Sequence, residues 1–587
     1  MIAWFDPAET LAEKIRETAS GVEGFDASFE PDVRPADPRF GDYQANGVLP
    51  YAKRQRTNPR ALGQALMDAL QADSFFAEAG VSMELAGPGF INFKFSNAAL
   101  SKWVETYKES SAFADAASKL KAGRKIVVDY SSPNTAKEMH VGHIRSTVIG
   151  DAIARILKFA GAEVLSDNHI GDWGTQFGMI IWGIKDSGFD LDAEHEDVIA
   201  DLEALYKAGN AAYKSSDETA DAVRQELVKL QSGDPENLAI WQKITDLSWS
   251  AFDKIYQQLG ISFDLVLGES FYRDKVDFIY EAMEKSGLSE ESDGAVVVFH
   301  PEHKRFKKQP FIIRKADGAS NYATTDLATI YHRTHELGVD ESIYVVDSRQ
   351  SDHFEQLFLT AGKWYEKQGW DVPGLKHVSF GTILGENGKP LKTKEGTSVK
   401  LKELLAEAIE RSEKIVAEKN PDLPEDERKH IAEVVGVNAV RYVDLSQNRA
   451  SDYLFSWEKL LSFEGNTAPY LLYATARIQN IFRKLEMEPG TGEDGASDLE
   501  TETELALARK LMGFMDAFKQ TLSDLRPHFM CAYLYELAGA FSSFYNADRV
   551  QGEAPDVKAR RLALCNRTLT VMTIGLGLLG IPVLKRM

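Results

Sequence analysis

The chain has 587 residues, of which 44% are hydrophobic and 27% charged, and its formal net charge is −22. This length exceeds what one hydrophobic core usually organises, and the composition excludes a disordered or fibrous protein, so we expect several globular domains. The two cysteines exclude a disulfide framework and indicate a reducing compartment such as the cytoplasm. Residues 1–7 lack a basic and then apolar segment, and 568–584 is rich in threonine and glycine, so we expect neither a signal peptide nor a membrane span.

The negative charge is concentrated in two stretches. Residues 186–237 carry a net charge of −10 and residues 485–504 a net charge of −8. The rest of the chain is nearly balanced and contains basic clusters at 119–125, 304–315 and 389–402. Phosphate contacts depend on charge within roughly 8–10 Å, so the acidic total does not exclude a nucleic-acid partner. Taken alone, solvated surfaces explain the basic clusters equally well.

Residues 1–118 are expected to form a separate α+β domain. Helical periodicity covers 8–19 and 59–79, whereas 81–85 and 90–95 alternate as strands around a glycine-rich turn.

Residues 119–400 alternate between predicted strands and helices, which favours a parallel sheet of the nucleotide-binding type. The expected elements are strands at 126–130, 163–166 and 342–347 and helices at 144–160 and 324–337. An insertion with helices of its own is expected at about 185–300. A glycine-rich loop at 171–178 follows the second strand, where ligands collect in such sheets; a packing turn is the alternative.

From residue 401 onward helices dominate, with a helical connector at 401–458 and a C-terminal helical domain at 459–587. The stretch Gly575-Leu-Gly-Leu-Leu-Gly580 matches the dinucleotide-binding fingerprint letter for letter. No predicted strand precedes it, so we interpret it as helix packing near a helix end.

The most informative segment is 129–143, Asp-Tyr-Ser-Ser-Pro-Asn-Thr-Ala-Lys-Glu-Met-His-Val-Gly-His. It lies between an apolar run and an amphipathic pattern, which predicts a loop leading into a helix N-terminus, where unpaired N–H groups favour anions. His140 and His143 can donate to phosphate oxygens, and Gly142 lets a flat ring approach the backbone. A metal-binding pair or an ordinary pair of helix-start histidines is the alternative.

This segment resembles the HIGH signature of class I aminoacyl-tRNA synthetases, in the longer form with an upstream lysine found in arginyl-tRNA synthetases. Lys137 is that lysine. Residues 388–396, Gly-Lys-Pro-Leu-Lys-Thr-Lys-Glu-Gly, resemble the KMSKS loop, although Pro390 and Thr393 replace its two lysines. The resemblance implies the catalytic residues Lys137, His140, His143, Lys392 and Lys394. It implies ATP binding by Pro133, Asn134, Lys137, His140, Gly142, His143 and Lys392. An exposed basic loop is the alternative for 388–396.

The resemblance also implies a pocket for arginine, whose planar guanidinium calls for carboxylates and an aromatic face. Tyr322 and Asp326 are four residues apart at the start of a predicted helix, which places them on one side of it. A helix-dipole charge is the alternative for Asp326. The implied arginine-binding residues are Asp129, Ser132, Asn134, His143, Tyr322, Asp326 and Gln350.

Both ends of the chain resemble tRNA-binding parts of the same family. Residues 41–44 and 88–95 resemble its N-terminal domain, which approaches the tRNA D-loop, and 470–477 resembles its anticodon-binding helices. The implied tRNA contacts are Asn92, Phe95, Tyr470, Tyr473, Arg477 and Met587. A hydrophobic strand and a core tyrosine stripe are the alternatives.

The resemblance therefore implies a Rossmann-type catalytic domain that activates L-arginine with ATP and transfers it to tRNA(Arg). ATP would bring Mg²⁺ with it as substrate, and no tightly bound metal or prosthetic group is expected. We expect a cytoplasmic enzyme that acts as a monomer and binds no membrane. A small-molecule nucleotidyltransferase and a non-catalytic RNA-binding relative of the synthetases are the alternatives.

Overall fold

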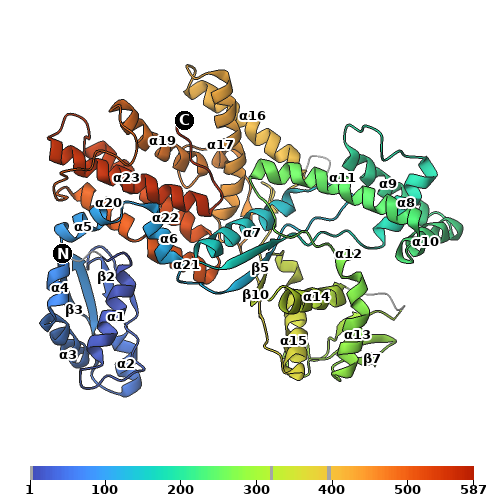
Figure 1. Cartoon of the computed structure of the whole chain (residues 1–587), viewed down its shortest axis with the longest axis horizontal. Coiled ribbons are helices and arrows are strands. Elements are labelled where there is room, and N and C mark those ends of the chain that lie inside the picture. Colours follow the sequence, from blue (N-terminus) through green and yellow to red (C-terminus); the bar gives the residue numbers. More distant parts are fainter. Residues whose placement is uncertain (1–3, 317–321, 393–397) are drawn as a thin grey trace. The chain divides into compact units, whose positions relative to one another are not determined.

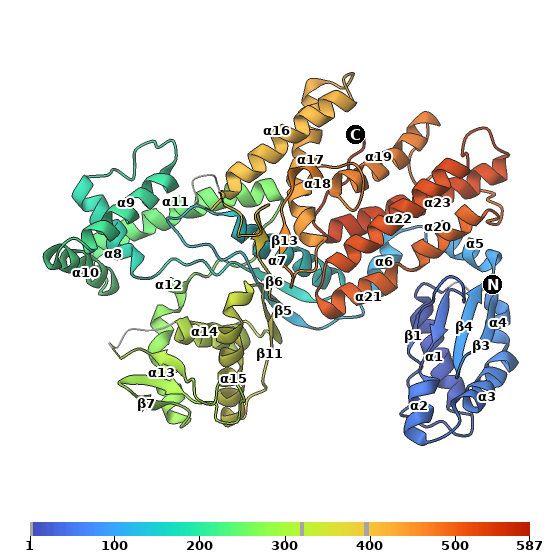
Figure 2. The same ribbon diagram turned by 180° about the vertical axis from the view of Figure 1, so that it is seen from behind.

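The structure is a computed structural model that describes residues 4–316, 322–392 and 398–587. The chain folds into two compact units, which can be followed in Figures 1 and 2. Unit 1 contains Met1–Leu120, Asn420–Ile431 and Leu461–Met587, and unit 2 contains Lys121–Lys419 and Ala432–Leu460. Within the described ranges, every helix is too short or too polar to span a bilayer.

The N-terminal part of unit 1 is an antiparallel sheet with helices. Its strands pair in the order β1-β2-β4-β3. The elements are α1 (Pro7–Ala19), β1 (Val33–Pro35), β2 (Tyr43–Ala45), α2 (Val48–Gln55), α3 (Pro59–Ala72), α4 (Ser74–Ala79), β3 (Val81–Ala86), β4 (Phe90–Phe95), α5 (Asn97–Thr106) and α6 (Ser110–Ala117). The helix predicted at 59–79 is in fact two helices, because Asp73 is extended and its carboxylate accepts the N–H of Phe75 at 2.9 Å, starting α4 anew.

The C-terminal part of unit 1 is helical, as expected. It contains α19 (Ala468–Lys484), α20 (Glu502–Met512), α21 (Phe514–Asp524), α22 (His528–Ala547) and α23 (Pro555–Leu578). Gly575 lies inside α23, where a Cβ atom would come within 2.6 Å of the Leu534 side chain on α22. The interpretation of this glycine-rich stretch as helix packing is confirmed.

The acidic stretch at 485–504 packs against buried arginines of α23. Glu504 Oε1 accepts hydrogen bonds from Arg560 Nε at 3.2 Å and from Arg561 Nε at 2.8 Å, and Glu493 pairs with Arg567. Buried charges require such partners. Part of the stretch's negative charge is therefore neutralised inside unit 1.

Unit 2 is built around a parallel sheet with the strand order β11-β10-β5-β6. Its elements here are β5 (Lys125–Asp129), α7 (Val141–Phe159), β6 (Glu163–Asp167), β10 (Glu341–Tyr344) and β11 (Gly374–His377). Pairing in register places Asp129 beside Tyr344 and Asp167 at the carboxyl ends of the strands. The predicted parallel sheet is confirmed, and its carboxyl edge is where such sheets bind ligands.

The region between β6 and β10 contains the expected helices and also a small sheet that the sequence analysis did not anticipate. Its elements are α8 (Gln176–Ser187), α9 (Val198–Tyr213), α10 (Asp217–Gln231), α11 (Pro235–Leu259), α12 (Glu269–Tyr272), a 3₁₀ turn (Arg273–Lys275), α13 (Val276–Lys285), β7 (Glu290–Ser292), β8 (Ala295–Val298), β9 (Phe311–Arg314), α14 (Tyr322–Tyr331) and a π-helical turn (His332–Glu336). This π turn replaces the end of the helix predicted at 324–337.

The remaining elements of unit 2 follow β10 in the chain. They are a 3₁₀ turn (Ser348–Gln350), α15 (Ser351–Gln368), β12 (Ile383–Leu384), α16 (Leu401–Lys419), α17 (Glu425–Leu445), β13 (Tyr453–Leu454) and α18 (Trp457–Leu460). Two buried ion pairs fix α7 to α17: Arg145 Nε lies 2.8 Å from Asp444, and Arg441 Nη1 lies 2.8 Å from Asp151. The helix that follows the histidine motif is thus anchored at two points.

Candidate active site

The loop between β5 and α7 has an unusual backbone. Three of its non-glycine residues have φ values of 76°, 49° and 58°, namely Ser131, Ser132 and Ala136. Such left-handed conformations cost free energy and persist only where surrounding contacts impose them. Here the N–H of Ser132 donates to Asn168 Oδ1 at 3.0 Å, and the N–H of Ala136 donates to Ser248 Oγ at 2.9 Å. The loop shape is therefore imposed by neighbouring segments of unit 2.

Gly171, in the glycine-rich loop after β6, lies directly against this loop. Its N–H donates to the Pro133 carbonyl at 3.0 Å, and its own carbonyl accepts the N–H of Thr135 at 3.1 Å. A Cβ atom at position 171 would lie 2.1 Å from Asn134 Oδ1, so only glycine leaves room for that amide. The structure brings together the two loops that the sequence analysis placed at one ligand pocket.

The two histidines form a reciprocal cap at the start of α7. His140 Nδ1 accepts the N–H of Gly142 at 3.1 Å, and His143 Nδ1 accepts the N–H of His140 at 3.0 Å. The rings stack with centroids 3.9 Å apart. Because each Nδ1 is an acceptor, each neutral ring carries its proton on Nε2, which remains a donor.

Burial keeps both imidazoles neutral. It lowers the pKa of His140 from its ordinary value, with a smaller contribution from the positive charge of Arg349. Burial and the neighbouring His140 lower the pKa of His143 to about 3. At neutral pH the pair therefore offers two N–H donors at a helix N-terminus rather than two cations, an arrangement suited to phosphate oxygens.

The segment after the predicted KMSKS-like loop pairs with the histidine motif. The N–H of Val141 donates to the Val399 carbonyl at 2.9 Å, and the N–H of Leu401 donates to the Met139 carbonyl at 2.9 Å. His140 and Lys400 thereby form an antiparallel bridge. The histidine motif is therefore adjacent, in unit 2, to the residues that directly follow the KMSKS-like segment, about 260 positions further along the chain.

Of the three predicted catalytic lysines, the structure describes Lys137 and Lys392. Lys392 is exposed and bridges Ser398 through the backbone, whereas Lys394 lies outside the described residues. Lys137 Nζ lies 5.1 Å from the centroid of the Tyr206 ring on α9. The catalytic roles of these lysines remain predictions.

Carboxylates and a tyrosine gather beside α12 and α14. Burial, followed by the negative charges of Asp172 and Asp326, raises the pKa of Glu269 to about 8. The charge of Glu269, followed by burial, raises the pKa of Tyr322. Asp326 Oδ2 lies 2.6 Å from His353 Nε2. A cation placed beside Glu269 would favour its ionised form.

Glu269 was missed by the sequence analysis, because no local pattern distinguishes it from the many other acidic residues. Its place depends on Asp172, whose carboxylate accepts the N–H of Ser270 at 2.8 Å and its hydroxyl at 2.6 Å. A Cβ atom at Gly268 would lie 2.4 Å from that carboxylate. The close approach of α12 to Asp172 brings Glu269 to the cluster.

Asp129, predicted to bind arginine, already binds a guanidinium of this chain. Arg333 Nη2 lies 2.6 Å from Asp129 Oδ2 and 2.7 Å from Asp167 Oδ2, and all three side chains are buried. Asp129 Oδ1 accepts a hydrogen bond from Ser132 Oγ at 3.2 Å. The sequence analysis did not identify Arg333, whose guanidinium also lies 5.2 Å from the centroid of the Tyr344 ring. A direct contact of Asp129 or Ser132 with substrate remains a prediction.

Gln350, the last predicted arginine-binding residue, is exposed and ends the 3₁₀ turn before α15. Its backbone N–H donates to the Asp347 carbonyl at 3.0 Å. Asp347 also pairs with Arg349, the residue whose charge acts on His140. The turn thus lies near the histidine motif, and a role for Gln350 in the pocket remains a prediction.

The two tRNA candidates in the N-terminal domain are buried. Asn92 Oδ1 accepts a hydrogen bond from Gln44 Nε2 at 2.6 Å. Phe95 packs edge-on against Trp4 and Tyr43 in the core. A base could not stack on Phe95 without opening this core, which favours the alternative of an ordinary hydrophobic strand for that residue.

The candidates on α19 form an aromatic and cationic surface. Tyr473 is exposed, and the Arg477 guanidinium lies 4.8 Å from its ring centroid and 5.2 Å from that of Tyr545 on α22. Tyr470 packs against Tyr535, also on α22, at 5.6 Å. The sequence analysis missed Tyr535 and Tyr545 because they come from another helix. Met587 is partly buried at the end of the chain.

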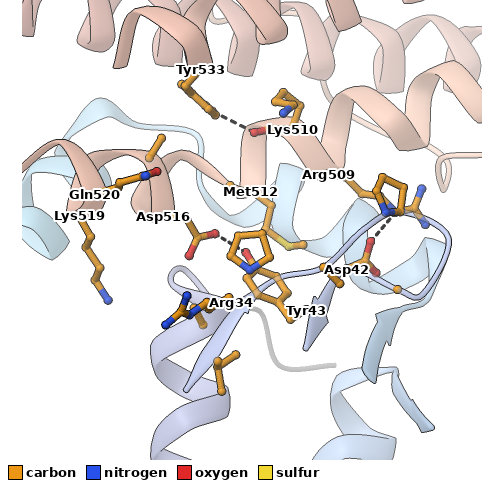
Figure 3. Close-up of a pocket in the computed structure, with 18 of the residues that line it drawn as sticks. Arg34, Asp42, Tyr43, Arg509, Lys510, Met512, Asp516, Lys519, Gln520 and Tyr533 are labelled. Carbon is orange, nitrogen blue, oxygen red and sulfur yellow. Dashed lines mark hydrogen bonds and ion pairs between the residues drawn. The ribbon is translucent and has the colours of Figure 1, made fainter. Parts of the chain in front are cut away.

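A cavity of about 1140 Å³ lies in unit 1, whereas the predicted catalytic residues belong to unit 2. Figure 3 shows two contacts across it: Tyr43 OH donates to Asp516 at 2.8 Å, and Arg509 Nε donates to Asp42 at 2.7 Å. Burial raises the pKa of Asp516 to about 6. These contacts join the N-terminal sheet to α20 and α21 within unit 1.

The part of the chain that the structure describes contains no group of three or more His, Cys, Asp or Glu side chains arranged to hold a metal ion.

Comparisons with known proteins agree with this geometry along the whole chain. Residues 110–457 match the family model of the class I (R) tRNA synthetase catalytic domain, and 471–587 match the DALR anticodon binding domain. Residues 9–95 match the arginyl tRNA synthetase N terminal domain. The fold and these family models therefore define a class I aminoacyl-tRNA synthetase.

Comparison with similar proteins identifies one family within this class. The chain is 42% identical to an arginine–tRNA ligase of Marinomonas sp. over 99% of this chain and 100% of that protein. It is 43% identical to that of Idiomarina loihiensis over 99% of each. The arginyl-tRNA synthetase structure from Plasmodium falciparum is 28% identical, with a TM-score of 0.82 and 100% of both chains covered. That from Thermus thermophilus is 26% identical, with a TM-score of 0.81, covering 99% of this chain and 100% of that one. The chain belongs to the arginyl-tRNA synthetase family.

Proposed function

We propose that the protein ligates L-arginine to tRNA(Arg) in two steps at the site in unit 2. Arginine and ATP first give arginyl-adenylate and diphosphate, and the arginyl group then passes to the 3′ end of the tRNA with release of AMP. The observation that supports the proposal is the backbone pairing of 139–141 with 399–401, since it brings the end of the KMSKS-like region beside the histidine motif, which follows the carboxyl end of β5.

In the first step the arginine carboxylate attacks the α-phosphate of ATP in line with the leaving diphosphate. The carboxylate is already ionised, so the step requires alignment and charge stabilisation rather than a general base. The Nε2–H donors of His140 and His143 would contact the phosphates, and Gly142 would leave room for the adenine or ribose. Lys137, Lys392 and Lys394 would stabilise the leaving diphosphate.

The arginine side chain would enter the cluster of negative groups at α12 and α14. Glu269 and Asp326 would accept the guanidinium hydrogens, with Tyr322 at the rim. A guanidinium there would return Glu269 to its ionised form, because a nearby cation offsets both its burial and the repulsion from Asp172 and Asp326. Lysine could not satisfy two carboxylates in the same bidentate way, so the cluster favours arginine.

The surface formed by Tyr470, Tyr473 and Arg477, with Tyr535 and Tyr545, would bind unstacked anticodon bases. Exposed rings combined with a guanidinium suit such bases, and all of this surface except Tyr470 lies within the segment matched by the anticodon-binding family. Contacts of Asn92 and Met587 with tRNA are part of the same proposal, whereas the burial of Phe95 in the core argues against a contact of its ring with a base.

Magnesium would arrive bound to the phosphates of ATP as part of the substrate rather than in a cage of protein ligands. We further propose that the enzyme acts as a monomer in the cytoplasm, where its two free, buried cysteines would remain reduced.

Aminoacylation of total tRNA with each radiolabelled amino acid tests the function. Arginine alone should be transferred, and only to tRNA(Arg). Exchange of pyrophosphate into ATP should depend on arginine and should be negligible without tRNA, as in the family. Charging with another amino acid, or no charging at all, would contradict the proposal, and brisk exchange without tRNA would contradict its tRNA dependence.

A further inference from the structure

Lys402, the second residue of α16, joins three segments that are remote in sequence. Its Nζ lies 2.8 Å from Glu138 Oε1 and 2.5 Å from Asp197 Oδ2. Glu138 belongs to the loop between Lys137 and His140, whereas Asp197 precedes α9 in the acidic insertion. Neither the resemblance nor the proposed chemistry gives these three residues a role.

The geometry and the charges of this triad are consistent with a strong contact. Glu138 has only 10% of its side chain exposed, against 34% for Asp197 and 41% for Lys402. Burial alone would lower the pKa of Lys402, but hydrogen bonds to Asp197 and Glu138 outweigh it and raise that pKa. Burial alone would raise the pKa of Asp197, yet hydrogen bonds from Lys402 and Ala200 lower it. Lys402 and Asp197 are therefore both charged at neutral pH.

The triad lies immediately beside the backbone pairing that defines the ATP site. Leu401, next to Lys402, donates its N–H to Met139, next to Glu138. Lys400 Nζ also approaches Glu138 Oε1, at 3.4 Å. The ion pairs thus reinforce the two backbone hydrogen bonds that hold the returning end of the KMSKS-like segment.

Helix α9 of the insertion contacts the same site at a second point. Asp197 caps this helix by accepting the N–H of Ala200 at 3.2 Å, and Tyr206 on the same helix lies under Lys137 Nζ. Lys137, Glu138, Asp197 and Lys402 also line one cavity of about 330 Å³. A single helix of the insertion, with its N-cap, therefore touches Lys137 of the histidine loop and Lys402, which follows the KMSKS-like segment on α16.

We propose that the Glu138–Lys402–Asp197 triad is a positioning device for adenylate formation. Through it, α9 holds the loop that bears Lys137 and His140 at a fixed separation from residues 399–402, which follow the KMSKS-like segment. The acidic insertion thereby keeps the two sides of the proposed ATP site in a fixed arrangement. The inference rests on the proposed function, since it concerns how the same reaction is aligned, and misplacement of about 1 Å can reduce a rate strongly.

The test uses tRNA-dependent pyrophosphate exchange and thermal unfolding of the full chain. Asp197→Asn removes the charge but keeps the oxygen that caps α9, since asparagine caps as well as aspartate. Glu138→Gln and Lys402→Met remove the other charges, and Lys402→Arg restores a cation. Lys414→Met is the matched control, because Lys414 forms an exposed ion pair with Glu410 at 2.7 Å on the same helix.

Asp197→Asn and Lys402→Met are expected to lower kcat about ten-fold while leaving the arginine KM within about two-fold and the unfolding temperature nearly unchanged. Lys402→Arg should recover most of the rate, and Lys414→Met should behave as wild type. The double variant Asp197→Asn/Lys402→Met should be no slower than Lys402→Met alone, because Lys402→Met already removes the contact that Asp197→Asn breaks.

Wild-type kcat in both Asp197→Asn and Lys402→Met would overturn the inference. So would a loss of rate that only follows a fall in unfolding temperature, or a failure of Lys402→Arg to rescue. These outcomes are distinct from failure of the proposed function, in which the wild-type chain itself would not charge tRNA with arginine.

Discussion

His143 holds His140 in place: its Nδ1 accepts the backbone N–H of His140 at 3.0 Å, while the two rings stack. This contact can form only when His143 is unprotonated at Nδ1. The second histidine of the motif is therefore both a candidate phosphate donor and a structural cap for the first.

The depressed pKa of His143 predicts a pH dependence of stability. The folded-state pKa of about 3 lies below the ordinary value, so the unfolded chain binds more protons between these values. The stabilising contribution is full above about pH 6.5 and is lost as the pH falls below it. Between about pH 7 and about pH 5, wild type should lose about 1–2 kcal/mol more than His143→Gln. Urea unfolding of both proteins measures this, and equal losses would contradict it.

The raised pKa of Glu269 predicts that arginine binds more tightly as the pH rises. With a pKa of about 8, this carboxyl is largely protonated at neutral pH in the free site, and a bound guanidinium favours its ionised form. The kcat/KM for arginine should therefore rise up to about ten-fold per unit below pH 8. Glu269→Gln should weaken arginine binding and remove this slope. An unchanged slope in the variant would exclude Glu269 as its source.

Asp326→Ala should raise the KM for arginine by about ten- to a hundred-fold, since one bidentate acceptor is lost, and should change the KM for ATP little. Exchange kinetics with each substrate varied in turn measure both constants. His353→Gln is the control, because it removes the ion-pair partner of Asp326 and keeps the carboxylate. Equal effects on both KM values would remove Asp326 from the pocket.

Arg333→Met should destabilise unit 2 by about 3–5 kcal/mol, because it leaves Asp129 and Asp167 buried without a cation. Replacing both carboxylates by asparagine in the same protein should recover much of this loss, since no unpaired buried charge then remains. Denaturant unfolding of the single and triple variants provides the comparison. A single variant as stable as wild type would show that the ion pairs contribute little.

Arg477→Ala should raise the KM for tRNA about ten-fold while leaving the arginine and ATP constants unchanged, because the guanidinium and the Tyr473 ring form one stacking surface. Arg483→Ala offers a control on the same helix, where Arg483 donates to Asn480 at 2.8 Å. Equal effects of the two substitutions would indicate a general charge effect instead of a specific contact.

The sequence predicted the parallel sheet, the helix after the histidine motif and strand β4, because long periodic patterns and glycine turns determine them locally. It did not predict the break at Asp73, where a single side chain caps a new helix. It also missed β7 to β9, whose strands of three or four residues are too short for a clear alternation.

The candidate site could be predicted from the sequence only where its residues lie close together in the chain. His140 and His143 stand in a compact motif, so their place at a helix start could be inferred from neighbouring residues. Arg333 and Glu269 come from segments far away, and Arg333 lies 204 residues from Asp129. These residues reach the site only through tertiary packing. The local pattern of a single sequence does not reveal such packing.

The contact between Gly171 and Asn134 has a consequence for redesign of the enzyme. Any larger side chain at position 171 would displace the Asn134 amide, whose oxygen occupies that space. Libraries that seek to charge tRNA with arginine analogues should therefore keep this glycine invariant and vary the rim near Tyr322, whose ring is largely exposed. If the proposed pocket is correct, we expect it to tolerate substitution poorly where the two loops meet and well near Tyr322.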